Sequence, residues 1–195
     1  MTFVETVLAL HNVLKEPQAD YNAFKRMLTS IRYRNGIIDG YPSRLHYASD
    51  WLFNNHQMCF VDFVEMGRAS ETFRPEVGFM STHPGLYPAL MNNPEYKAEM
   101  AKHEARINTM LIKYMPKDKL TSKAGFIHSG DIIVIKTDIK GLDFTHLGFA
   151  LRNNGEVYLL HASSTCKKVL ISSQSLKNYL SDIKKNTGVV VVRPL

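Results

Sequence analysis

The sequence predicts an α+β domain in which N-terminal helices pack on a mainly antiparallel sheet of about five to six strands. Apolar residues recur at helical spacing through most of the first 111 positions. Beyond residue 124 the pattern changes to short runs rich in β-branched residues, with turn residues between them. Neither an internal repeat nor a linker-like stretch divides the 195 residues, so we expect a single domain over 1–195.

Two helices are expected to open the domain. The first covers the apolar positions from residue 3 to residue 14 and ends before Pro17. No capping Ser, Asp or Asn precedes its first turn, so we expect the natural start of this helix to lie upstream. Asp20 is the expected N-cap of the second helix, whose buried stripe includes Phe24 and Ile31.

The middle of the chain gives a mixture of signals. A third helix is expected over 45–55, and only weak strand signals follow over 56–80. The stretch 80–88, with two prolines and a glycine, is expected to be a loop. Asn93 is the expected cap of a long helix that ends near Pro116.

The strands of the second half are bounded by turn residues. They are expected over 131–136, 143–151, 157–164, 168–172 and 188–193, with a helix near 175–184 before the last. The second and third of these strands flank Asn154-Gly155, the dipeptide typical of a two-residue type I′ hairpin loop. The sequence therefore predicts a β-hairpin at the centre of the sheet.

This hairpin carries two histidines. With Asn154 and Gly155 as the loop, His161 lies opposite Gly148, and His146 lies diagonally across from His161 on the same face. One interpretation is that both are structural histidines. The other is that one is a general base and the second orients it, with the small neighbouring side chain leaving space beside them.

An aromatic and basic stretch over 31–51 is the expected recognition surface. Aromatic rings and guanidinium groups together can stack a ligand and clamp a carboxylate with two hydrogen bonds. The candidate substrate-binding residues here are Tyr33, Arg34, Tyr41, Arg44, His46, Tyr47 and Trp51. Ser81 and His83 are further candidates for polar contacts to the substrate. The alternative is a solvated loop followed by a helix whose aromatic residues cover the core.

Composition excludes several classes of function. The net charge of +6 suits a nucleic acid or an acidic polymer, but the basic residues are scattered and we expect no nucleic-acid partner. No apolar run approaches the ~20 residues of a membrane span. No basic segment leading into an apolar core is visible at the N-terminus. Cys59 and Cys166 form neither a metal-type pair nor a disulfide framework.

Elimination narrows the chemistry. His103-Glu104 lacks the second histidine of a zinc hydrolase, and the spacing of the two hairpin histidines is not a metal signature, so neither a metal nor another cofactor is expected. Paired carboxylates for a glycosidase cannot be chosen from the sequence. Serine-hydrolase elbows and phosphate-binding glycine loops are absent. The remaining interpretation is nucleophilic catalysis with His146 as base and His161 as its partner, which requires a nucleophile on another element. A thiol at a helix N-terminus suits this role because the helix dipole lowers its pKa.

Several segments together resemble the DUF1460 family of N-acetylmuramoyl-L-alanine amidase-like proteins, a branch of the NlpC/P60 papain-like cysteine peptidases. They are 2–10 (TFVETVLAL), 31–36 (IRYRNG), 40–47 (GYPSRLHY), 130–133 (GDII) and 145–148 (THLG). The resemblance implies a papain-like fold and a cell-envelope protein that acts on peptidoglycan fragments (muropeptides). It also implies that His146 is the catalytic histidine, that His161 is the third, orienting residue, and that the stretch 33–51 lines the cleft.

In that family the nucleophilic cysteine stands directly before the segment that matches Met1 to Glu5. The resemblance therefore implies a chain that starts just after its catalytic cysteine, because neither Cys59 nor Cys166 matches that position. We expect a cell-wall amidase or peptidase whose 195 residues are inactive by themselves. The alternatives are a non-catalytic muropeptide-binding module and a glycan hydrolase.

Overall fold

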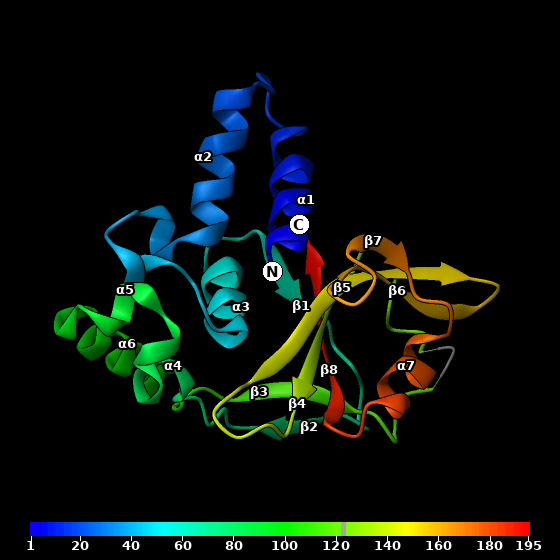
Figure 1. Cartoon of the computed structure of the whole chain (residues 1–195). Coiled ribbons are helices and arrows are strands. Elements are labelled where there is room, and N and C mark those ends of the chain that lie inside the picture. The colour runs from blue at the N-terminus through cyan, green and yellow to red at the C-terminus, as the bar shows by residue number, and fades with distance from the viewer. Residues whose placement is uncertain (122–123) are drawn as a thin grey trace.

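The computed structural model describes residues 1–121 and 124–195 and has the expected α+β architecture (Figure 1). The α-helices are α1 (Thr2–Val13), α2 (Tyr21–Arg32), α3 (Ala48–Gln57), α4 (Phe79–Thr82), α5 (Pro88–Met91), α6 (Pro94–Ile107) and α7 (Leu176–Asp182). Short 3-10 turns are η1 (Arg34–Gly36), η2 (Tyr41–Ser43) and η3 (Pro84–Leu86). The strands are β1 (Val61–Phe63), β2 (Glu71–Phe73), β3 (Ile112–Pro116), β4 (Ile132–Thr137), β5 (Phe144–Asn153), β6 (Glu156–Ser163), β7 (Lys168–Ile171) and β8 (Asn186–Pro194).

All strands belong to one antiparallel sheet. Seven of them follow the order β2-β3-β8-β4-β5-β6-β7, and β1 pairs with β8 outside this path. The expectation of about five to six strands was therefore too low, because the described part of the chain contains eight. Two of the additional strands, β1 and β2, lie in the stretch 56–80 that gave only weak strand signals, because each is three residues long and too short to show a clear alternating pattern.

The expected long helix after Asn93 is real, but it ends at Ile107 rather than near Pro116. The side chain of Asn108 stops the helix because it accepts a hydrogen bond from the Val77 amide (2.7 Å) and donates one to the Val77 carbonyl (2.8 Å). The chain then turns into β3, in which Pro116 pairs with Gly188 of β8. A tertiary contact thus overrides the apolar periodicity.

Other boundaries also differ from expectation. The predicted loop over 80–88 contains the helical turns α4, η3 and the start of α5. The helix expected over 45–55 begins at Ala48, because the preceding segment is extended and Leu45 donates a backbone hydrogen bond to the Arg32 carbonyl. The Asp20 cap is confirmed, since its carboxylate accepts a hydrogen bond from the Ala23 amide at 2.7 Å.

The two faces of the central strands are buried under different layers. Even-numbered residues of β4 such as Val134 pack with α1, α2 and α3, whereas odd-numbered residues such as Ile135 pack toward α7. Figure 1 shows α1 and α2 as a helical pair beyond the sheet, with α7 at the opposite end. The N-terminus of α1 lies next to the middle of β5 (Figure 1). A third cluster joins α4, α5 and α6 around Tyr47.

No helix within residues 1–121 or 124–195 is both long and apolar enough to cross a membrane.

Candidate active site

The β5-β6 hairpin has the register that the Asn-Gly dipeptide predicts. Asn153 pairs with Glu156, and the ladder continues in steps of one residue. Asn154 (φ 48°) and Gly155 (φ 82°) both have positive φ, as a type I′ loop requires. Local turn chemistry therefore determines which β6 residue lies beside each β5 residue.

This register brings the two hairpin histidines into direct contact. Nε2 of His146 lies 2.7 Å from Nδ1 of His161, and the two rings are nearly perpendicular at 86°. Gly148 makes the contact sterically feasible. A Cβ atom at this position would lie 2.7 Å from the Leu160 carbonyl oxygen and 3.0 Å from Cβ of His161.

A β-bulge adjoins the histidine pair. Ile135 of β4 pairs with His146, but Lys136 pairs with Phe144, so Thr145 is an extra residue on β5. Bulges bend a strand locally and are common beside active sites, where they redirect side chains. The backbone around His146 is thus irregular although the hairpin itself is regular.

The hydrogen bond between the rings restricts which ring nitrogen can act as a base. If Nε2 of His146 donates to Nδ1 of His161, then Nδ1 of His146 carries the free lone pair. This Nδ1 has no hydrogen-bond partner among residues 1–121 and 124–195. On the other side of the pair, the Tyr179 ring of α7 contacts the His161 ring edge-on, with 5.5 Å between the centroids. His161 is therefore fixed between His146 and α7.

The electrostatic environment favours neutral imidazoles. Burial, the neighbouring His161 and the α-amino group of Met1 together lower the pKa of His146 to about 4, with burial as the largest cause. Burial also lowers the pKa of His161, which is only 4% exposed. Both rings are therefore neutral near pH 7, the state that a general base requires.

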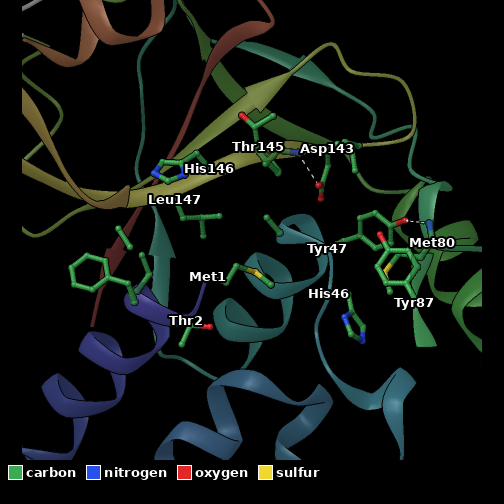
Figure 2. Close-up of a pocket in the computed structure, with 16 residues that line it drawn as sticks. Met1, Thr2, His46, Tyr47, Met80, Tyr87, Asp143, Thr145, His146 and Leu147 are labelled. Carbon is green, nitrogen blue, oxygen red and sulfur yellow. Dashed lines mark hydrogen bonds between the residues drawn. The ribbon is translucent and has the colours of Figure 1, made fainter. Parts of the chain in front are cut away.

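A pocket of about 410 Å³ lies between the start of α1 and the start of β5 (Figure 2). It is lined by Met1, Thr2, Phe3, Val4, His46, Tyr47, Ala48, Met80, Tyr87, Leu142, Asp143, Phe144, Thr145, His146, Leu147 and Ala162. Five parts of the chain thus meet here: the first turn of α1, the segment leading into α3, the α4–α5 region, the β4-β5 connection with β5, and β6. His146 lines this pocket on β5, and Met1 lies across from it at the start of α1 (Figure 2).

Asp143 connects two walls of this pocket. Its carboxylate is 4% exposed and accepts hydrogen bonds from the amide (2.7 Å) and hydroxyl (2.6 Å) of Ser49 in the first turn of α3. The other carboxylate oxygen accepts a hydrogen bond from the Phe144 amide at 2.7 Å. A negative charge at a helix N-terminus is favourable, although burial raises the pKa of Asp143. The N-terminus of α3 is therefore tied to the strand that carries His146.

Two of the candidate recognition residues, His46 and Tyr47, line the pocket. The Tyr41 ring packs against the His46 ring with 4.4 Å between the centroids, and its carbonyl lies 3.1 Å from His46 Nε2. The Tyr47 hydroxyl donates a 2.6 Å hydrogen bond to the buried carboxylate of Glu104. Burial and this carboxylate raise the pKa of Tyr47, so the phenol stays protonated.

The two candidate arginines are bound by internal carboxylates. Arg44 pairs with Glu5 of α1 at 2.8 Å. Arg34 pairs with Asp50 of α3 at 2.7 Å, and Arg106 binds the same carboxylate. Neither arginine lines the pocket.

The remaining candidates lie away from the pocket. Trp51 is 0% exposed and belongs to the core beneath α1 and α2. Tyr33 forms an isolated β-bridge with Arg44. Ser81 and His83 belong to the α4 region and do not line the pocket, and His83 stacks on Phe79 instead.

Several residues that line the pocket were missed by sequence reasoning. Met80 and Tyr87 are brought to the pocket by the helical turns of the α4 to α5 segment, which was expected to be a loop. Asp143 could have been suspected because an acidic residue directly precedes a buried strand, but its partner Ser49 is 94 positions away.

The described residues contain no cluster of three or more metal-binding side chains. Both cysteines are free and exposed: Cys59 follows α3, and Cys166 lies in the β6-β7 turn. Neither lines the pocket that contains His146.

Several solved structures are similar to this chain over almost its whole length. An N-acetylmuramoyl-L-alanine amidase from Bacteroides uniformis ATCC 8492 is 42% identical with a TM-score of 0.94, covering 100% of this chain and 82% of that one. A Bacteroides fragilis protein, provisionally named a xylanase, is 41% identical with a TM-score of 0.92, covering 98% of this chain and 84% of that one. A Legionella pneumophila DUF1460 protein is 23% identical (TM-score 0.73, covering 100% of this chain and 74% of that one) and supports the fold alone.

No match was found among curated proteins. Residues 1–189 match the AmiA-like family, which is described as N-acetylmuramoyl-L-alanine amidase-like. With nearly the whole chain matched, this protein belongs to the AmiA-like family of N-acetylmuramoyl-L-alanine amidase-like proteins.

Proposed function

We propose that this protein is a bacterial cell-wall amidase that hydrolyses an amide bond in the stem peptide of peptidoglycan. The bond is either the one between muramic acid and L-alanine or the D-glutamyl bond to the diamino acid. The name of the Bacteroides uniformis relative supports the first of these. The observation that carries the proposal is the 2.7 Å contact between His146 and His161 beside a pocket at the start of α1.

The nucleophile in this proposal is a cysteine directly before Met1, as in NlpC/P60 papain-like enzymes. Two observations support that position. Met1 lines the same pocket as His146, and its α-amino group lowers the pKa of the His146 imidazole. A residue joined to Met1 would therefore lie near Nδ1 of His146 and near the first-turn amides of α1, where the helix dipole favours a thiolate.

The proposed reaction uses His146 twice. Nδ1 takes the proton of the thiol, and the thiolate attacks the carbonyl carbon of the scissile amide. The resulting oxyanion would be stabilised by backbone N–H groups at the start of α1. The imidazolium then returns the proton to the leaving amine, and water hydrolyses the thioester with His146 again as base. His161 holds the His146 ring in the required tautomer and orientation.

His46 and Tyr47 are the proposed contacts to the substrate, with Tyr41 holding the His46 ring. A protonated tyrosine can pack against the stem peptide with its ring. Substrate contacts from Tyr33, Arg34, Arg44, Trp51, Ser81 or His83 are not supported by the pocket geometry, because none of these residues lines it.

The experiment compares three proteins: the 195-residue chain, the same chain with one cysteine added before Met1, and a matched version with serine added instead. Purified muropeptides are digested and the products are identified by mass spectrometry. We expect amide cleavage only with the added cysteine, and loss of that cleavage in the same protein with His146→Gln. Equal cleavage by the serine version would overturn the cysteine mechanism.

A non-catalytic muropeptide-binding module is the second candidate, because neither Cys59 nor Cys166 lines the pocket. It predicts binding without turnover for all three proteins. A glycan hydrolase is less well supported, since Asp143 is the only carboxylate among the described pocket residues and its two oxygens are already hydrogen-bonded. A cell-envelope location follows from the proposed substrate.

A further inference from the structure

A second cleft, of about 230 Å³, adjoins the candidate active site. Leu142 and Asp143 line both cavities, so the two share a wall at the β4-β5 connection. Its other lining residues are Phe73, Arg74, Pro75, Glu76, Lys136, Thr137, Asp138, Ile139, Lys140 and Gly141.

Lys136 is the distinctive residue of the cleft. Its amine is half-buried and lies over the rings of Phe73 (4.6 Å) and Tyr114 (5.0 Å). Its hydrogen-bond partner is a neutral group, the hydroxyl of Thr187 at 3.2 Å. Burial lowers the pKa of Lys136. A partly desolvated ammonium without a carboxylate partner in the described chain has an unmet preference for an anion.

The acidic groups nearest Lys136 already have other partners. Asp138 pairs with Lys185 at 3.6 Å, and Glu71 pairs with Lys119 at 2.7 Å. Both raise the pKa of Lys136, against the larger effect of burial. These acids therefore do not neutralise Lys136 directly.

The cations that line the cleft have no direct ion-pair partner in the described part of the chain. Asp143 is occupied by the amide and hydroxyl of Ser49. Arg74 and Lys140 make no ion pair within the described ranges, and among the lining acids only Glu76 also lacks a partner there. The lining thus holds three cations (Arg74, Lys136 and Lys140) and three acids (Glu76, Asp138 and Asp143). None of the three cations is ion-paired within residues 1–121 and 124–195, so each is available to an anionic ligand.

The position of Lys136 relates the cleft to the catalytic histidine. Lys136 pairs with Phe144 on β5, and Phe144 precedes His146 by two residues. Phe144 lines the first pocket, and its ring contacts Phe73 of the second cleft, with 5.9 Å between centroids. A peptide bound with its scissile amide near His146 and running along the start of β5 would bring its next groups to Lys136.

We infer that Lys136, with Arg74 and Lys140 at the rim of the cleft, binds the α-carboxylate of the D-glutamyl residue of the stem peptide and so selects peptides in which this group is free over those in which it is amidated. This inference rests on the proposed function. In this inference the positive charge that binds the substrate comes from Lys136 and not from Arg34 or Arg44. Arg34 is paired with Asp50, and Arg44 is paired with Glu5. A charge-assisted hydrogen bond in a half-buried site provides the discrimination, because a carboxamide is neutral.

The test measures binding of two probes to the 195-residue chain by titration calorimetry: N-acetylmuramoyl-L-alanyl-D-glutamate and its carboxamide analogue with D-isoglutamine. We expect the carboxylate probe to bind about 10- to 100-fold more tightly. Lys136→Met should remove most of this preference while changing the affinity for the carboxamide less than about twofold. Lys136→Arg, which keeps the positive charge, should retain part of the preference for the carboxylate probe. Lys168→Met, on the exposed strand β7, is the control and should leave this preference unchanged.

Each other outcome is decisive. If Lys136→Met weakens both probes equally, or if the unaltered chain does not discriminate between them, the inference is wrong while the proposed function stands. If neither probe binds to the unaltered chain, the proposed function fails and this inference fails with it. Thermal unfolding shows whether each variant is folded. If Lys136→Met does not fold, the preference for the carboxylate probe is compared between Lys136→Arg and the unaltered chain.

Discussion

Nε2 of His146 lies 2.7 Å from Nδ1 of His161, across neighbouring strands of one hairpin. A two-residue turn at Asn154 and Gly155 sets the register that makes this contact. The distance is short enough for one imidazole to hold the tautomer of the other, while Nδ1 of His146 stays available for a reacting proton. The geometry thus fits the roles proposed for His146 as base and His161 as its orienting partner.

Gly148→Ala is expected to separate the two histidines. The added methyl group would lie 2.7 Å from the Leu160 carbonyl and 3.0 Å from Cβ of His161, so strand β6 must move. We expect a loss of about 1–3 kcal/mol in the free energy of unfolding, measured with urea. Gly85→Ala is the control, because a Cβ at Gly85 meets open space. An equal effect of the two substitutions would contradict the close approach at Gly148.

The stability of the protein is expected to fall as the pH decreases below about 6.5. Burial lowers the pKa values of His46, His103, His146 and His161, and that of His146 reaches about 4. Between each folded pKa and the unfolded value, the unfolded chain binds more protons, so acid favours unfolding. The raised pKa of Asp143 has the opposite effect on stability, because its contribution is lost as the pH rises.

The histidine contribution can be isolated with His146→Gln. After allowance for partial exposure of the ring, we expect the loss of stability between pH 7 and pH 4 to shrink by about 1–2 kcal/mol in this variant. Chemical unfolding at several pH values measures the slope. A slope that does not change would show that the His146 imidazole titrates normally in the folded protein.

Asp143→Ala is expected to destabilise the protein by about 2–4 kcal/mol, because it leaves the Ser49 amide and hydroxyl without their acceptor inside the protein. Ser49→Ala, which removes one of these hydrogen bonds, should cost about 1 kcal/mol. If Asp143→Ala is no worse than Ser49→Ala, the carboxylate does not tie α3 to β5 in the way described. Calorimetric melting temperatures provide the comparison.

Glu5→Gln is expected to cost about 2–4 kcal/mol. The Glu5 carboxylate is fully buried and pairs with Arg32 at 3.0 Å and Arg44 at 2.8 Å, so its removal leaves both guanidinium groups without their anion. Glu65→Gln is the matched control, because it breaks an exposed pair with Lys113 and should change stability by less than about 1 kcal/mol. Similar effects in urea unfolding would mean that Arg44 is free for another ligand.

Sequence reasoning succeeded where short-range rules decide the structure. The Asn-Gly turn gave the correct hairpin register, and Asp20 gave the correct helix start. The paired histidines follow from the turn by counting residues along β5 and β6. These features depend on neighbours in the chain, whose chemistry is visible in the sequence.

It failed where distant residues decide. The end of α6 depends on contacts between Asn108 and Val77, which the sequence does not reveal. The ion pairs of Arg34 with Asp50 and of Arg44 with Glu5 were likewise not visible in the sequence. The aromatic stretch over 31–51 divides between pocket and core, because Trp51 faces inward whereas Tyr47 lines the cavity. Composition alone cannot separate these environments, since an aromatic residue suits both.

The most direct test of the central claim is the reactivity of a thiol placed directly before Met1, in a Cys59→Ser and Cys166→Ser background. The rate of alkylation by iodoacetamide is measured against pH, with and without His146→Gln. The account predicts a thiol pKa well below its usual ~8.5, and a return toward that value when His146 is replaced. The same pH dependence in both proteins would show that His146 does not act on a nucleophile at this position.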